Sequence, residues 1–314
     1  MRILVTGADG FVGSWLVPQL RQQGHAVLAA MLPGAAAPQA WASDTGIRVT
    51  RLDLTDSESV RALTALKPEA VVHLAAVASG GDARRDPGAA WRVNAMGTAL
   101  LAGTLGQLVA EGRGDPLLLL ASTAEVYGRG PETPRRETDP TAPVSSYAAS
   151  KLAAEVAALE VHRRTGLRVV IARAFAHTGR GQDARFVVPA LARRLLVARR
   201  AKAPVIKVGN LEPVREFMHV ADVVDAYGRL LERGRSGETY NVASGQGIAL
   251  SDVLDRLMAI VGHRVIAEAD PELVRPADIP YLVGDATRLQ AATQWAPRVG
   301  LDELLREVVD AQTD

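Results

Sequence analysis

The sequence predicts an α/β fold: a doubly wound parallel sheet followed by a smaller C-terminal α/β lobe. Three observations predict it. Apolar strand patterns alternate with helical patterns through the first half of the chain, a glycine-rich turn joins the first strand to the first helix, and one strand carries four leucines in a row. A strand without polar alternation is typical of a parallel sheet that helices cover on both faces. The chain, at 314 residues, is long enough for a large core.

The elements follow in order from their hydrophobic periods. Expected strands cover residues 2–6, 25–31, 47–52, 70–76, 116–121 and 168–173, and expected helices begin after Gly13 and cover 57–66, 87–109 and 145–159. A doubly wound sheet binds its ligands at the carboxyl ends of its strands. The residues expected at those ends are Gly7, Asp53, Ala75, Ser122 and Thr123.

The first turn carries the pattern Gly7-x-x-Gly10-x-x-Gly13, with Phe11 and Val12 inside it. Glycine at these places permits a tight turn, close approach of a pyrophosphate to backbone N–H groups, and close packing of helix on strand. Its position between strand and helix predicts a Rossmann dinucleotide site for NAD or NADP. The segment 28–34 after strand two has neither an acid for the adenosine ribose nor an Arg for a 2′-phosphate, so the choice between them stays open.

Composition excludes several classes of function. The chain is 48% apolar and 23% charged with a net charge of +1, which gives no reason to expect a nucleic acid or anionic membrane partner. It has no cysteine, hence no disulfide or thiolate chemistry, and we predict no metal site. No uninterrupted apolar run approaches the roughly 20 residues of a membrane span, and the first residues enter a strand directly. We expect a soluble, cytoplasmic protein.

Chemistry is expected around Tyr147-x-x-x-Lys151. Residues four apart lie on one face of a helix, so the phenol and the ammonium would be close, and the ammonium would lower the pKa of the tyrosine. Thr123 follows the fifth strand about twenty residues earlier. A hydroxyl donor with such a pair is what carbonyl reduction needs: Thr123 would bond the substrate oxygen, Tyr147 would exchange its proton, and Lys151 would stabilise the phenolate and hold the nicotinamide ribose.

Several motifs together resemble the extended short-chain dehydrogenase/reductases of the nucleotide-sugar epimerase/dehydratase group. They are the glycine turn, Asp53-Leu54, His73-Leu74-Ala75-Ala76, Asn94 before Gly97-Thr98, Ser122-Thr123 through Tyr127-Gly128, and Tyr147 with Lys151. The resemblance implies that Asp53 and Leu54 flank the adenine and that Leu74, Ala75 and Ala76 lie against the cofactor. It implies structural roles for His73 and Asn94.

The C-terminal third resembles the lobe that grips a nucleotide diphosphate in this family, with His177, Arg215 and Arg275 as substrate-binding residues. Arg suits the task because guanidinium makes bidentate contacts with phosphate. The spacing is most similar to that of GDP-4-keto-6-deoxy-D-mannose reductases, which make GDP-D-rhamnose. Ala176, where the family usually has Asn, leaves the base of the nucleotide open. We expect Asp222 to cap a helix.

Other reactions of the family stay open. Glu125 occupies the position of the C5 base of nucleotide-sugar dehydratases, whereas Ala124 lacks the second acid of the dTDP-glucose enzymes. A 4,6-dehydratase of the GDP-mannose type or a 4-epimerase, each with tightly bound NAD, is the alternative. A non-catalytic cofactor-sensing protein is a more remote alternative. Such proteins typically lack the Tyr or the Lys, and this chain has both.

The resemblance also predicts domains and assembly. Residues 1–173 would form the NAD(P)-binding domain and residues 174–314 mainly the substrate lobe, with a segment near 214–242 returning to the first domain. Family members commonly dimerise through helices that here would span about 88–109 and 146–165. The second is rich in alanine, which suits close helix packing either between two copies or within one chain. From the resemblance we expect a homodimer.

Overall fold

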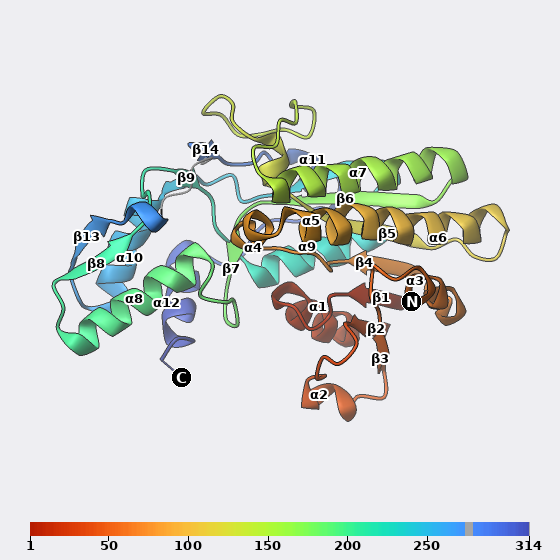
Figure 1. The fold of residues 1–314 in the computed structure, drawn as a ribbon, viewed down its shortest axis with the longest axis horizontal. Coiled ribbons are helices and arrows are strands. Elements are labelled where there is room, and N and C mark those ends of the chain that lie inside the picture. The colour runs from red at the N-terminus through yellow and green to blue at the C-terminus, as the bar shows by residue number, and fades with distance from the viewer. Residues whose placement is uncertain (274–278, 314) are drawn as a thin grey trace.

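The computed structural model describes residues 1–273 and 279–313 and is built around a parallel sheet (Figure 1). Seven strands of these residues form it in the order β11-β6-β5-β4-β1-β2-β3. They are β1 (Arg2–Thr6), β2 (Ala26–Met31), β3 (Ile47–Arg51), β4 (Ala70–His73), β5 (Leu117–Thr123), β6 (Arg168–Ala174) and β11 (Thr239–Val242). The predicted doubly wound fold is confirmed. Strand four ends three residues earlier than expected and strand five two residues later.

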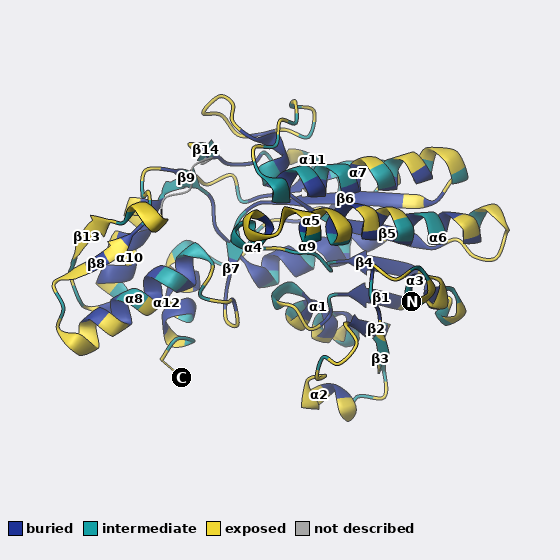
Figure 2. Ribbon diagram, in the orientation of Figure 1, coloured by how far each residue is buried: buried dark blue, intermediate teal, exposed yellow. Residues whose placement is uncertain are grey.

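Helices cover both faces of the sheet. Those that follow the strands are α1 (Phe11–Gln22), α2 (Gln39–Ala42), α3 (Ser57–Ala62), α6 (Thr98–Ala110), α7 (Ser146–Thr165), α9 (Val220–Arg233) and α11 (Thr287–Thr293). Short segments between them are α4 (Gly80–Arg85), α5 (Pro87–Ala90), the 3₁₀ turns η1 (Leu63–Leu66) and η3 (Ala124–Tyr127), and a π-helical stretch, η2 (Trp91–Gly97), that runs into α6. Figure 2 shows the buried residues concentrated in the sheet and on the inner sides of these helices.

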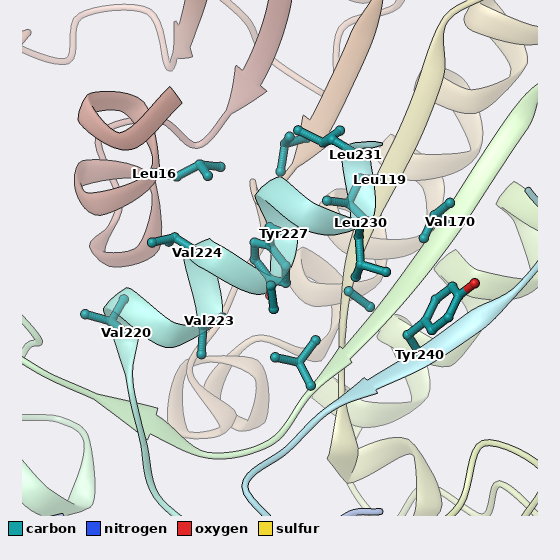
Figure 3. Packing of buried hydrophobic residues seen from close by; sticks show 14 of the residues in the cluster. Leu16, Leu119, Val170, Val220, Val223, Val224, Tyr227, Leu230, Leu231 and Tyr240 are labelled. Carbon is teal, nitrogen blue, oxygen red and sulfur yellow. The ribbon is translucent and has the colours of Figure 1, made fainter. Parts of the chain in front are cut away.

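The leucine run of β5 shows how the two cores form. Leu117 and Leu119 point into a core with α1 and α9, whereas Leu118 and Leu120 point into a second core with α3, α6 and α7. Figure 3 shows the first of these cores, in which Tyr227 of α9 packs between the sheet and α1. Since successive side chains of a strand alternate in direction, a strand covered on both faces is apolar throughout.

A second lobe lies to one side of the sheet (Figure 1). Its own core joins α8 (Val187–Ala201), α10 (Leu250–Val261) and α12 (Leu301–Asp310) with β8 (Val205–Val208). The exposed strand β13 (Ile266–Ala269) pairs with β8 in parallel. Two small sheets connect the lobes: β7 (His177–Thr178) with β10 (Met218–His219), and β9 (Val214–Arg215) with β12 (Ile248–Ala249) and β14 (Tyr281–Leu282). A 3₁₀ turn, η4 (Pro271–Leu273), follows β13.

The chain crosses between the lobes more than once. After the first segments of the second lobe, α9 packs on α1 and β11 pairs with β6 at the edge of the large sheet. We therefore propose residues 1–173 and 174–314 as the two domains, with α9 and β11 belonging structurally to the first.

One helical stretch of the described residues, Pro87–Ala110, is long and apolar enough to cross a membrane, judged by length and composition alone. Half of its most apolar window is buried inside the protein, where Leu101, Leu105 and Leu108 pack in the second core. A buried core helix has the same composition, so this stretch is weak evidence for a membrane span.

Candidate active site

A large cleft between the lobes is lined by most of the predicted site residues. Its volume is about 1460 Å³, larger than the roughly 300–1,000 Å³ of a cleft for one small ligand. The five strand-end residues named from the sequence all line it: Gly7, Asp53, Ala75, Ser122 and Thr123. The cleft therefore has room for a dinucleotide and a second ligand side by side.

The glycine turn is shaped for close approach. Gly7 has φ +65°, and a Cβ there would lie 2.9 Å from the Ala75 backbone. A Cβ on Gly13 would lie 2.4 Å from the Gly7 carbonyl oxygen, so the start of α1 packs directly on the turn. Gly10 is the N-cap of α1 and has no side chain to occupy the helix N-terminus. With Phe11 and Val12 these glycines line the cleft and form a cradle for a pyrophosphate, which fits NAD or NADP.

Leu54, Leu74, Ala75 and Ala76, which the resemblance places against the cofactor, also line the cleft. The Asp53 carboxylate instead accepts bonds from the backbone N–H (2.8 Å) and hydroxyl (2.7 Å) of Thr55, which lower its pKa. Asp53 thus shapes the turn after β3.

Arg51, two residues before the cleft-lining Asp53, is a cation that sequence reasoning missed; it is not itself among the residues that line the cleft. It ends β3, and its guanidinium reaches the Leu32 and Ala35 carbonyl oxygens after β2, at 3.2 and 2.7 Å. No motif in the sequence marks it, since the contact depends on the pairing of the two strands.

Thr123, Tyr147 and Lys151 are brought together as predicted. Thr123 ends β5 and Tyr147 lies in the first turn of α7. Both line the cleft, and the Thr123 side chain is close enough to Tyr147 to act on its pKa. The Ser145 hydroxyl starts this helix by accepting a bond from the Ala148 N–H at 3.1 Å. Lys151 is only 5% exposed, and its ammonium donates to the Ala121 carbonyl oxygen of β5.

The expected effect of the lysine on the tyrosine is wrong in this structure. The pKa of Tyr147 is raised, first by burial and then by the nearby Glu125 carboxylate, with the Thr123 side chain acting in the opposite direction. Burial lowers the pKa of Lys151 to about 8, opposed by Glu155. The physical reason is that the ammonium points at the backbone of β5, so it does not face the phenol.

Glu125 lies close to Tyr147 in the cleft. It lines the cleft, its charge acts on Tyr147, and its Oε2 accepts a bond from the Ser145 hydroxyl at 3.5 Å. Ala124 is buried beside it.

The substrate-lobe candidates are placed in part. His177 lines the cleft, stacks on Phe11 of the glycine turn with ring centroids 6.2 Å apart, and donates from Nδ1 to the Phe175 carbonyl oxygen at 2.9 Å. Burial lowers its pKa. Arg215 of β9 and Ala176 also line the cleft. Arg275 lies outside the described residues.

His73 and Asn94 hold backbone and strand ends together from inside the protein. Buried His73 joins the Thr6 and Thr98 hydroxyls, at 2.7 and 3.0 Å, and burial lowers its pKa to about 3. Asn94 satisfies both backbone groups of Val77. These two structural roles are confirmed.

Asp222 does not cap α9. His219 is the cap and accepts from the Ala221 N–H at 3.0 Å, while the Asp222 carboxylate accepts from the Val299 N–H at 3.1 Å. The prediction was wrong because an imidazole can accept this bond as a carboxylate does, and it does so here from a position earlier in the chain.

Sequence reasoning also missed an ion pair across the cleft. Arg185, before α8, donates to Asp82 of α4 at 2.7 Å, and both residues line the cleft. Neither residue belongs to a motif. Among the described residues, no group of three or more His, Asp or Glu side chains is placed to hold a metal ion.

A dinucleotide cradle beside a Thr–Tyr–Lys group is the arrangement of an NAD(P)-dependent oxidoreductase. The family model described as GDP-mannose 4,6 dehydratase matches residues 4–308, and the chain belongs to this family. The predicted resemblance is confirmed.

Two curated relatives are similar over nearly the whole chain. A GDP-6-deoxy-D-mannose reductase of Pseudomonas aeruginosa is 34% identical, covering 98% of this chain and 96% of the relative. A GDP-6-deoxy-D-talose 4-dehydrogenase of Aggregatibacter actinomycetemcomitans is 31% identical, covering 92% and 90%.

Solved structures share the fold. RMD from Pseudomonas aeruginosa, complexed with NADPH, has a TM-score of 0.82 at 33% identity over 99% of this chain and 98% of its own. A UDP-glucose 4-epimerase of Thermus thermophilus, complexed with NAD, has a TM-score of 0.86 at 31% identity over 100% and 99%.

Proposed function

We propose that this protein is an NAD(P)H-dependent reductase of the 4-keto group of a nucleotide-linked 6-deoxyhexose, converting GDP-4-keto-6-deoxy-D-mannose to GDP-D-rhamnose. The observation that carries the proposal is the meeting of Thr123 and Tyr147 beside the glycine turn in one two-ligand cleft, in a chain 34% identical to a GDP-6-deoxy-D-mannose reductase. The cofactor is NAD or NADP.

Each residue has a role in this reaction. The bound dinucleotide supplies the hydride equivalent. The Thr123 hydroxyl bonds the keto oxygen and orients it, and the Tyr147 hydroxyl donates a proton to the oxygen as it becomes an alkoxide. Because the pKa of Tyr147 is raised, its hydroxyl is protonated at neutral pH and holds the proton that the reduction consumes. Lys151 supplies positive charge beneath the site, and His177 and Arg215 bind the nucleotide sugar.

The alternative is a 4,6-dehydratase or 4-epimerase that recycles tightly bound NAD. Glu125 favours it, because a carboxylate beside the substrate could remove a C5 proton. The neighbouring residue is the buried Ala124, which lacks the second acid of the dTDP-glucose dehydratases. This difference counts against that subgroup and leaves the choice between reductase and GDP-mannose-type dehydratase to the assay.

One assay separates the two. The purified protein is mixed with NADPH or NADH and either GDP-mannose or its 4-keto-6-deoxy product, and the absorbance of the reduced nicotinamide is followed. A reductase consumes one reduced cofactor for each keto sugar and leaves GDP-mannose unchanged. Conversion of GDP-mannose without net loss of cofactor would establish the alternative, and no reaction with either sugar would contradict both.

We also propose a cytoplasmic homodimer. An apolar groove between the helices near 91–103 and α7 contains Trp91 and Val156, 44% and 58% exposed. The alanines of α7 divide between two surfaces: Ala148, Ala154 and Ala158 are in the core, whereas Ala149, Ala153 and Ala157 line this groove. Helix packing between two copies would bury the groove. Val156→Arg should convert a dimer to a monomer in analytical ultracentrifugation, and a wild-type monomer would contradict the proposal.

A further inference from the structure

The core side of α7 carries an acid that the proposed chemistry does not use. Glu155 is 2% exposed and lies one helical turn after Lys151, which is 5% exposed. Charged groups so deeply buried are costly unless they are paired and hydrogen-bonded. The contacts of Glu155 therefore indicate what holds it there.

Two adjacent strands bind this carboxylate. Arg173 of β6 donates from Nη2 to Oε2 at 2.7 Å and from Nε to Oε1 at 3.0 Å, and the Ser122 hydroxyl of β5 donates to Oε1. Ser122 and Arg173 are partners in the register of the two strands. The guanidinium also lies over the Tyr127 ring, 4.9 Å from its centre. Glu155 thus joins α7 to both strands at one level of the sheet.

Lys151 contacts β5 one residue before Ser122, the residue that Glu155 binds on the same strand. Its ammonium donates to the carbonyl oxygen of Ala121, the residue before Ser122 on β5. Two side chains one turn apart on α7 therefore bind two successive residues of β5, directly before Thr123. This pair of contacts sets the position of α7 along β5, and with it the position of Tyr147 against Thr123.

Glu155 is the negative charge that acts on Lys151. His73 of β4 is near enough for the Lys151 charge to act on it, but burial first and then this charge lower its pKa to about 3, so it is neutral near pH 7. Glu155, on α7 itself, opposes the effect of burial on the lysine.

We propose that Glu155 is a positioning residue of the site: paired with Arg173 and Ser122, it locks α7 onto β5 and keeps the Lys151 amine protonated beneath Tyr147. The consequence of this role for catalysis rests on the proposed reduction. The effect of Glu155 on Lys151 does not depend on any reaction. Since burial lowers the pKa of Lys151 to about 8, removing a nearby negative charge lowers it into the neutral range.

The test is a titration of Lys151 in Glu155→Gln. The chain has four lysines, so ¹³C-lysine-labelled protein gives few signals, and Lys151→Met assigns the one of interest. We expect the midpoint of Lys151 to fall by on the order of one pH unit in Glu155→Gln. The matched control is Glu160→Gln, which breaks an exposed ion pair with Arg164 on the outer face of the same helix and should leave Lys151 unchanged. An equal midpoint in wild type and Glu155→Gln overturns the proposal.

A second variant guards against loss of folding. Glu155→Gln leaves the Arg173 charge buried without its partner, so Glu155→Gln with Arg173→Gln removes both charges. The midpoint of Lys151 should fall in this variant also. If the reductase assay gives turnover, the alkaline limb of the kcat profile should shift to lower pH by the same amount, and an unshifted limb would contradict the positioning role. Absence of turnover in wild type would count against the proposed function, while the titration still decides the role of Glu155.

Discussion

The Lys151 ammonium donates a hydrogen bond to the backbone carbonyl of Ala121, two residues before Thr123 on β5. The helix and the strand that carry the two hydroxyl groups of the site are thereby joined directly. The Lys151 ammonium is therefore bonded to the sheet, while Tyr147 lies near Thr123 in the cleft. Because of this contact, Tyr147 and Lys151 share one site although the ammonium is bonded to β5 and not to the phenol.

Removing the tyrosine hydroxyl tests the proton donor. Tyr147→Phe should lower kcat by about 10²–10⁴-fold, the range for loss of a general acid, because the phenol is the group that gives its proton to the keto oxygen. Binding of NADPH, followed by fluorescence titration, should be kept. Tyr281→Phe, on β14 outside the cleft lining, is the matched control. Unchanged kcat in Tyr147→Phe would exclude the proposed role.

Filling the glycine cradle tests the dinucleotide site. Gly13→Ala places a methyl group 2.4 Å from the Gly7 carbonyl oxygen, so the turn must move away from the start of α1. We expect the Kd for NADPH to rise at least tenfold by calorimetry. Gly114→Ala meets its nearest atom at 3.9 Å and should leave the Kd unchanged. A Kd that stays the same in Gly13→Ala would show that the cofactor does not depend on this turn.

The ion pair across the cleft should have a small effect on substrate binding. Arg185 and Asp82 are 52% and 27% exposed, and exposed pairs contribute about 0.2–1 kcal/mol. Arg185→Ala should therefore raise the KM for the nucleotide sugar by no more than about fivefold, with the effect shrinking in high salt.

A double-mutant cycle with Asp82→Asn measures whether the pair acts together, since coupled residues give non-additive changes. The control is Arg256→Ala, which breaks a similarly exposed pair with Asp302 between α10 and α12. Additive effects in the cycle would mean that the two residues act separately.

Glu216 predicts a pH dependence of stability. It is fully buried and accepts bonds from the N–H groups of Ser244, Gly245 and Gly284, and burial raises its pKa to about 7 from 4.5. The folded state holds this proton more tightly than the unfolded state. Its contribution therefore lowers stability as pH rises from 4.5 to 7, and the cost is fully present above pH 7.

Glu216→Gln removes this dependence. The stability of the variant relative to wild type should increase by about 3 kcal/mol or less between pH 5 and pH 8, measured by urea unfolding. His73 has the opposite dependence between pH 3 and 6.5, because its pKa is lowered, but it is present in both proteins and cancels in the difference. A constant difference at the two pH values would contradict the prediction.

Much of the fold and part of the site could be predicted because their signals are local. Each of these signals lies within a few residues of sequence: the run Leu117–Leu120, the glycine turn, and the spacing of Tyr147 and Lys151. Strand-end positions followed from the rule that parallel strands end at one edge of the sheet, and all five candidates line the cleft.

The remaining features depend on which elements meet. The partner of Lys151 is a backbone carbonyl, which carries no mark in the sequence. Arg185 and Asp82 are 103 positions apart and meet only because the two lobes face each other. The direction of the Tyr147 pKa shift depends on burial and on Glu125. The four-residue spacing of Tyr147 and Lys151 contains no information on either.

The sequence by itself determined the class of fold, the dinucleotide turn and the identity of the hydroxyl and amine groups, because periodicity and short motifs encode them residue by residue. The tertiary structure alone decided how those groups are charged and held: Lys151 against β5, Glu155 between Arg173 and Ser122, and Tyr147 against Thr123. Electrostatic effects depend on distance and burial in space, and these exist only once the strands and helices have packed.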